Sequence, residues 1–141
     1  MQGEATYLDI TPQAGQAFFS APPPGELVML NLLRFRAVAD YSATPALAPA
    51  TPISGEDAYR RYIAHTAPLL ERSGGQVMFL GRAHVQLIGP PGEYWDAAML
   101  VRQRDARTFL AFASDPESQA GIGHRTAALA DSRLLPLTQD F

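Results

Sequence analysis

The segment from Leu27 to Phe35, LVMLNLLRF, restricts the fold of this chain more than any other feature of the sequence. It is apolar at nearly every position, and the turn residues 22–25 (PPPG) stand before it. A short, continuous apolar run is typical of a β-strand that is buried on both sides, because alternate side chains of a strand point to opposite faces. The fold must therefore cover both faces of this strand.

Capping residues mark where the helices should begin. Side chains that can accept a hydrogen bond from the first helical turn stand at Thr11, Ser54, Asp105 and Asp115. The helix after Ser54 is long and amphipathic; Pro68 should kink it, and Gly74-Gly75 should end it. The helix after Asp115 is predicted to continue to about Leu129.

Three more strands are predicted, at 76–88, 94–103 and 134–137, with a tight reversal at 89–92 between the first two. The resulting order, helix, β, α, β, β, α, β, predicts an α+β domain of ferredoxin-like βαββαβ topology with a four-stranded antiparallel sheet and an extra N-terminal helix.

We expect one domain over residues 1–141, with a helical extension at 1–25. A Pro/Ala-rich loop at 37–53 has no periodicity. Three interpretations of it are open: a lid, a structureless insertion, and a strap over a partner.

One layer of helices can cover only one face of such a sheet. In the first strand Val28, Leu30 and Leu32 alternate with Leu27, Met29 and Leu33, so both faces are apolar. A second copy of the chain, related by a two-fold axis, would cover the face that the helices leave open. The sequence therefore predicts a homodimer whose two sheets pack face to face.

Composition excludes several functional classes. The net charge is −3 and the eleven basic residues, all arginine, are scattered, so we expect no nucleic acid as partner. No apolar run approaches the roughly 20 residues of a membrane helix, and no basic leader precedes an apolar stretch, so we expect no membrane partner and a cytoplasmic location. Without cysteine or lysine, thiolate, iron–sulfur and Schiff-base chemistry are excluded, and we expect no cofactor.

Several segments together resemble the domain of unknown function 1330 family. They are residues 28–35 (VMLNLLRF), Ser54-Gly55 with Ala58-Tyr59 and Tyr62, Trp95-Asp96, Asp115-Pro116-Glu117, and His124-Arg125 with Ala127-Ala128-Leu129. The resemblance spans roughly residues 27–137 and implies the dimeric α/β-barrel superfamily. That superfamily includes cofactor-independent monooxygenases, haem-degrading enzymes, lactone isomerases and stress-response proteins, so the resemblance leaves the activity open.

Four residues are candidates for lining a small-molecule site. Asn31 interrupts an apolar strand, where an unpaired amide costs about 1–3 kcal/mol, so it needs either a ligand or a backbone group as partner. Tyr59 and Tyr62 on the long helix, and Trp95 on the predicted strand 94–103, combine an aromatic body with a polar tip. The alternative for these aromatics is a place in the core.

Charged candidates are Arg34, Arg125 and His124. Either arginine could hold an anionic or enolate ligand, or form an ion pair with Asp96 or Asp131. The three histidines, His65, His84 and His124, have no metal-ligand spacing, so we expect no metal. His124 is the candidate catalytic base, because the neighbouring cation Arg125 should lower its pKa. The alternative for each of the three histidines is a surface or capping role.

Two functions stay open at this point. One is a homodimeric domain that binds a small apolar or aromatic compound, acting as a cofactor-independent monooxygenase or isomerase. The other is a non-catalytic dimerisation or stress-related module, in which the same residues serve packing. A cavity that holds the polar atoms named above favours the first, and a filled core favours the second.

Overall fold

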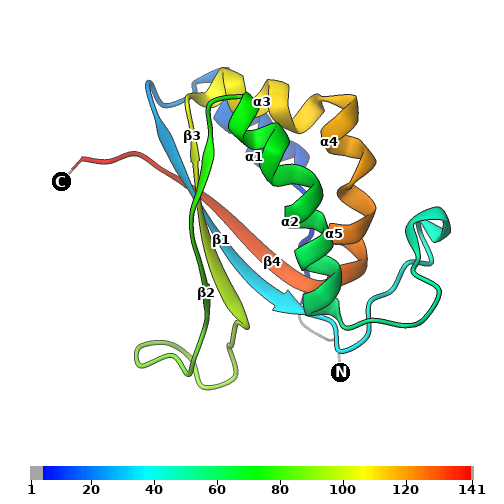
Figure 1. Cartoon of the computed structure of the whole chain (residues 1–141). Coiled ribbons are helices and arrows are strands. Elements are labelled where there is room, and N and C mark those ends of the chain that lie inside the picture. The colour runs from blue at the N-terminus through cyan, green and yellow to red at the C-terminus, as the bar shows by residue number, and fades with distance from the viewer. Residues whose placement is uncertain (1–4, 141) are drawn as a thin grey trace.

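A four-stranded antiparallel sheet with helices packed on one face forms the centre of the molecule (Figure 1). The computed structural model describes residues 5–140. The strands are β1 (Leu27–Phe35), β2 (Gln76–Arg82), β3 (Ala97–Gln103) and β4 (Leu129–Leu137), in the order β2-β3-β1-β4. This order is that of the ferredoxin-like fold, so the predicted fold class is confirmed.

The helices are α1 (Pro12–Ser20), α2 (Gly55–Arg72), α3 (Ala106–Ser114), α4 (Pro116–Ala120) and α5 (Ile122–Ala128). The predicted caps act as expected: Ser54 accepts a hydrogen bond from the Asp57 N–H at 3.0 Å, and Asp105 accepts one from the Thr108 N–H at 2.7 Å. Gly74 ends α2 with a φ of 92°, which glycine adopts without strain. Pro68 lies inside α2, which continues to Arg72.

The predicted helix from Asp115 to about Leu129 is wrong in one respect, because it is divided in two at Gly121. A side chain at this position would meet the ring of His65 on α2, so the close approach of the two helices requires glycine there. Glycine is also a poor residue for the interior of a helix. The chain therefore ends α4 and starts α5 at this point.

The predicted strand bounds are wrong at three places. β2 ends at Arg82 rather than Ile88, and β3 begins at Ala97 rather than Tyr94, so residues 83–96 form a long connection. β4 begins at Leu129 rather than Leu134. The first part of β4 does not look like a strand in the sequence, because Asp131 and Ser132 are polar. Both residues are nevertheless buried where β4 pairs with β1.

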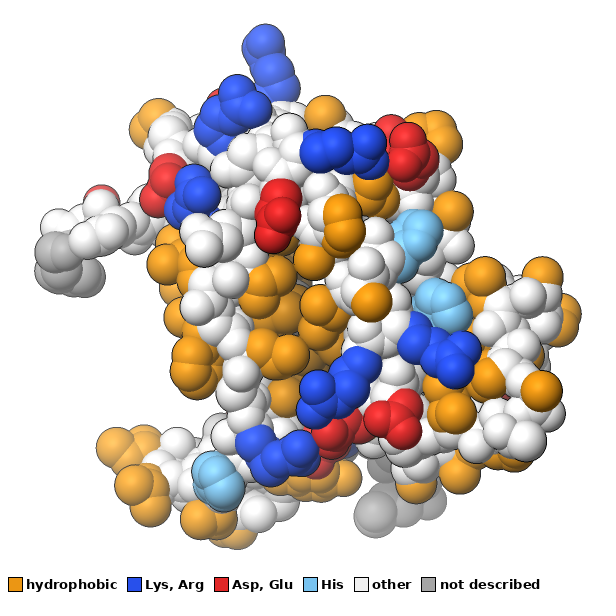
Figure 2. All heavy atoms as spheres, viewed as in Figure 1, with side chains coloured by type: hydrophobic (Ala, Val, Ile, Leu, Met, Phe, Trp, Pro, Cys, Tyr) orange, Lys and Arg blue, Asp and Glu red, His pale blue; other side chains and the backbone are white. Residues whose placement is uncertain are grey.

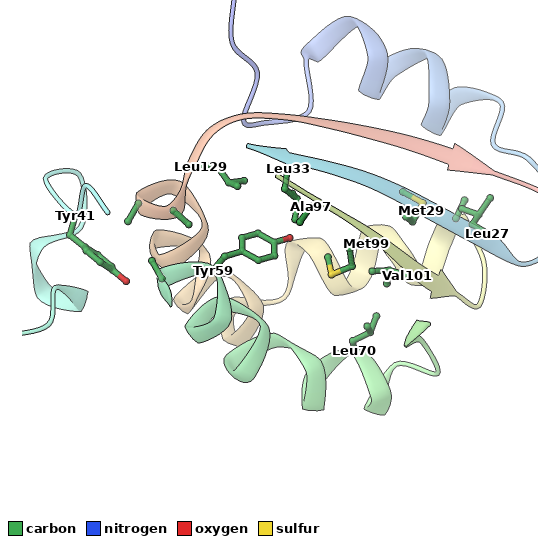
Figure 3. Packing of buried hydrophobic residues seen from close by; sticks show 14 residues of the cluster. Leu27, Met29, Leu33, Tyr41, Tyr59, Leu70, Ala97, Met99, Val101 and Leu129 are labelled. Atoms are coloured by element: carbon green, nitrogen blue, oxygen red, sulfur yellow. The ribbon is translucent and has the colours of Figure 1, made fainter. Parts of the chain in front are cut away.

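The core lies between the sheet and α2, α3 and α5 (Figure 3). Leu27, Met29 and Leu33 of β1 and Met99 and Val101 of β3 face the helices. The opposite side chains of β1, Val28, Leu30 and Leu32, are only partly buried, on a face that no helix of residues 5–140 covers. The prediction of two apolar faces is confirmed.

The Pro/Ala-rich loop is bound to the helical layer. The Ala39 N–H donates to the Ile53 carbonyl and the Asp40 N–H to the Ala127 carbonyl, both at 2.9 Å, and Tyr41 is buried. A short 3-10 helix, η1 (Pro45–Leu47), packs against Gly123 of α5. This loop therefore covers the outer side of α5.

Candidate functional site

A cavity of about 830 Å³ lies between the helix-facing side of the sheet and helices α1 to α5. Figure 2 shows its apolar wall as a recess between β2 and α2. Helix α1 closes it along β4, where Phe19 stacks on Phe109 of α3 with ring centroids 6.2 Å apart. Apolar side chains form most of the wall: Phe18, Phe19, Met29, Ile63, Leu70, Val77, Met99, Val101, Phe109 and Phe112.

Asn31 lies in the floor of this cavity, at the middle of β1. Its amide nitrogen donates long hydrogen bonds to the Met29 carbonyl at 3.3 Å and the Met99 carbonyl at 3.5 Å. Backbone groups thus satisfy the nitrogen, as the structural alternative predicted. The side-chain oxygen receives no hydrogen bond from any residue within 5–140, which leaves it for a ligand.

Tyr59 and Tyr62 line the cavity from α2, with ring centroids 5.4 Å apart. Figure 3 shows the Tyr59 side chain pointing from α2 toward the sheet, near Leu33. Burial raises the pKa of the Tyr59 phenol, and the neighbouring Tyr62 adds to this, while the charge of Arg125 opposes it. Burial likewise raises the pKa of Tyr62 against the charge of Arg125. Both phenols are therefore neutral hydrogen-bond donors at neutral pH.

Arg125 reaches the cavity from α5. Its guanidinium donates to the Leu8 carbonyl and, at 3.3 Å, to the Ser132 hydroxyl. The expected ion pair with Asp96 or Asp131 is wrong for both Arg34 and Arg125, because Asp131 binds Arg133 at 2.7 Å and Asp96 accepts from the Phe35 N–H. The charge of Arg125 is thus held by neutral groups among the described residues.

Three further polar side chains line the cavity that were not predicted from the sequence. The oxygen atoms Thr66 Oγ1, Gln103 Oε1 and Ser118 Oγ are buried without a hydrogen-bond partner among the described residues, and all three residues line the cavity. Gln103 could have been found, because it continues the alternation of Ala97, Met99 and Val101 along β3. No sequence signal marks the other two.

Arg34 and Trp95 lie elsewhere. Arg34 is on the face of the sheet away from the helices; its guanidinium donates to the Tyr94 carbonyl at 2.7 Å and lies 4.1 Å from the Tyr94 ring centroid. The Trp95 ring lies between Arg34 and Arg133, whose guanidinium carbons are 5.2 and 5.1 Å from the ring centroid. Neither residue lines the cavity.

His124 also lies outside the cavity lining. Its Nδ1 is 2.7 Å from the Tyr41 hydroxyl of the Pro/Ala-rich loop. Burial lowers the pKa of His124, followed by the charges of Arg61 and His65, whereas we had expected Arg125 to be the cause. Within residues 5–140 no group of three histidine or acidic side chains could hold a metal ion, and no helix is both long and apolar enough to cross a membrane.

Comparison with known proteins places the chain among structures without an assigned activity. No family model matches it, and no curated protein does. The crystal structure of the RPA0582 protein of Rhodopseudomonas palustris, a protein of unknown function, is 31% identical over 97% of this chain and 99% of that chain, with a TM-score of 0.85.

Two more distant structures share the fold alone. A dimeric ferredoxin-like protein of unknown function from Jannaschia is 14% identical, covers 82% of this chain and all of its own, and has a TM-score of 0.52. An uncharacterized NIPSNAP domain protein from Burkholderia xenovorans is 13% identical over 81% of this chain and 94% of that chain, with a TM-score of 0.50. The resemblance to the domain of unknown function 1330 family stays a prediction.

Proposed function

Because the chain belongs to the same family as the RPA0582 protein of Rhodopseudomonas palustris, whose function is unknown, we propose its function from its cavity: it is a homodimeric protein that binds a small apolar or aromatic compound between the sheet and the helices. The observation that carries this proposal is a mostly apolar cavity with unpartnered, buried polar oxygen atoms in its wall.

The size and lining of the cavity fit a ligand site. Ligand cavities in proteins are typically about 300–1,000 Å³, apolar, and supplied with a few polar groups that orient the ligand. A buried polar atom without a partner costs about 1–3 kcal/mol. Three such atoms around one cavity therefore lower the stability of the ligand-free protein substantially. A bound molecule, alone or with water, would recover part of this free energy.

A packing role alone explains the cavity less well. In a dimerisation module all apolar side chains would serve the core, and protein cores leave few voids larger than a water molecule. The Pro/Ala-rich loop, whose residues are absent from the cavity lining, is not needed as a lid. As an isomerase or cofactor-independent monooxygenase, the protein would act on a compound bound in this cavity. His124 does not line the cavity, so another residue would have to be the base.

The homodimer is the second part of the proposal. The uncovered face of the sheet carries an apolar surface made of eight residues from all four strands, here called the open face: Val28, Leu30, Leu32, Phe79, Ala98, Leu100, Leu135 and Leu137. An apolar face of an antiparallel sheet needs a cover. The similar protein from Jannaschia is described as dimeric, which supports a second copy as that cover.

A thermal-shift screen against small aromatic and quinone-like compounds tests ligand binding. A ligand at 100 times its Kd stabilises a protein by about 2.7 kcal/mol, which raises the melting temperature of a chain of this size by on the order of 10 °C. Ala67→Phe, which places a ring into the cavity from α2, should abolish the shift. Ala64→Phe, one turn earlier on the exposed side of α2, should preserve it. A broad library without any shift would contradict the proposal.

A further inference from the structure

Resting on the proposed function, we infer that the ligand is an elongated amphiphile: an anionic oxygen, such as a carboxylate, contacts Arg125, Tyr59 and Tyr62, and an apolar body extends toward the phenylalanine-lined end of the cavity. The inference combines the charge of the lining, the donors that lie near that charge and the separation of the charged end from the phenylalanine-lined end.

Two arginines line the cavity, Arg125 and Arg133, and of these Arg125 has no carboxylate bound to it among the described residues. Within residues 5–140, Arg125 donates only to a carbonyl and a hydroxyl oxygen. Asp131 is bound to Arg133, and Asp9, the one acidic residue that lines the cavity, is exposed and forms no ion pair within residues 5–140. A guanidinium beside an apolar cavity binds a carboxylate well, because its planar donors match two carboxylate oxygens.

The neighbours of Arg125 at this end of the cavity are hydrogen-bond donors. Arg125 donates to Ser132, which pairs with Leu33, and Figure 3 shows Tyr59 pointing toward the sheet near Leu33. The ring of Tyr62 lies 5.4 Å from that of Tyr59 and lines the same cavity. Each neutral phenol can donate one O–H to an anion. A guanidinium and two phenols at one end of a mostly apolar cavity suit an anionic oxygen better than a neutral group.

The charged end of the cavity and its phenylalanine-lined end lie at opposite ends of the sheet. Ser132, which accepts from Arg125, pairs with Leu33 of β1. At the other end Gln103, whose Oε1 is one of the unpartnered oxygen atoms, pairs with Leu27, and α3 follows directly with Phe109 and Phe112. The seven residues from Leu27 to Leu33 span about 20 Å of extended strand. A molecule that contacts both ends is therefore long and narrow.

Calorimetric titration with matched acids and alcohols tests the inference. The probes are decanoate with decan-1-ol, and 4-butylbenzoate with 4-butylbenzyl alcohol. Wild-type protein should bind each acid at least about tenfold more tightly than its alcohol. Arg125→Gln should make the two affinities about equal. Arg61→Gln, which removes the same charge from the exposed side of α2, should keep the preference for the acid.

The outcomes test the anionic head, the inference as a whole and the role of the phenol separately. Equal affinity of acid and alcohol in the wild type would overturn the anionic head and leave the proposed ligand cavity intact. Binding of none of the four probes would overturn this inference, while the thermal-shift screen decides the proposed function separately. If Arg125→Gln fails to fold, Tyr59→Phe keeps the charge and removes one donor; it should reduce the ratio of acid to alcohol affinity about threefold, and an unchanged ratio would contradict the role of the phenol.

Discussion

The imidazole of His124 is held between the helical layer and the Pro/Ala-rich loop. Its Nδ1 pairs with the Tyr41 hydroxyl at 2.7 Å, and the two rings meet edge to face with centroids 5.5 Å apart. Burial, then the charges of Arg61 and His65, lowers the pKa of His124 below its ordinary value of 6.5. The folded protein therefore favours the neutral imidazole, which can accept a hydrogen bond from Tyr41.

This pKa predicts how stability depends on pH. In the unfolded chain His124 has its ordinary pKa, so between the two values the unfolded state binds more protons than the folded state. The free energy of unfolding should thus fall as the pH drops below about 6.5. Urea unfolding of the wild type between pH 7.5 and 5.5 measures the slope, and His124→Gln should reduce it.

A second histidine variant makes the comparison specific. His84 is exposed in the connection between β2 and β3, so His84→Gln should leave the slope as it is in the wild type. Equal slopes in all three proteins would show that His124 does not titrate differently in the folded state.

At the scale of elements, the structure depends on a close junction where β1 ends, α2 begins and α5 ends. The Gly55 N–H donates to the Arg36 carbonyl at 3.0 Å, and the Arg36 N–H donates to the Ala128 carbonyl at 2.8 Å. A Cβ on Gly55 would meet the Arg36 carbonyl oxygen and lie 2.5 Å from the Ala128 carbonyl oxygen. All of these are backbone atoms, which cannot move aside as the end of a flexible side chain can.

Gly55→Ala should therefore lower the free energy of unfolding by about 3 kcal/mol, because overpacking here must separate two helices and a strand. Gly92→Ala is the matched control: nothing lies within 4 Å of a Cβ at that position, so the change should stay within about 0.5 kcal/mol. Urea unfolding of the three proteins measures both values. Gly55→Ala with wild-type stability would show that the junction is looser than described.

Helix starts and strand ends differ in how far sequence can predict them. The caps at Ser54 and Asp105 were predictable because a cap is a contact between residues three apart. The ends of β2, β3 and β4 were not, because strand length depends on pairing with residues far along the chain. Apolar residues such as Leu87 and Ile88 therefore suggested a strand, although they lie in an exposed connection.

The same distinction applies to the candidate site. Asn31, Tyr59 and Tyr62 share one cavity because strand alternation and helical spacing placed them on inward faces. Arg34 shares a strand with Asn31 but lies three residues further, so alternation puts it on the opposite face. That Arg125 would reach the same cavity depends on how α5 packs, which no local pattern contains.

At the scale of the whole molecule, the open face is an apolar surface that the helices of the described chain leave uncovered. Leu135 of β4 is 54% exposed and Phe79 of β2 is 57% exposed, on either side of the partly buried Leu30 and Leu100. Val85, Leu87 and Ile88 of the connection between β2 and β3 are 84–96% exposed, and Figure 2 shows apolar side chains gathered there, where the chain projects beyond the sheet. Such a surface would promote aggregation if it stayed open to water.

A two-fold partner removes this problem in one step, because each copy covers the open face of the other. Sedimentation velocity at micromolar concentration should thus give the mass of a dimer for the wild type. Leu135→Glu should give a folded monomer, since a two-fold interface would bury two carboxylates, each at a penalty of several kcal/mol. The fold itself should tolerate the change, because Leu135 is exposed in the protomer.

Leu110→Glu separates loss of this interface from a general effect of added charge. Leu110 lies on α3, away from the open face, and is 44% exposed. The variant therefore introduces the same charge at a comparably exposed leucine. It should remain a dimer, and circular dichroism should show both variants folded. A dimeric Leu135→Glu protein, or a monomeric wild type, would mean that something other than a second copy covers the open face. The sheet would then need a different partner as its cover.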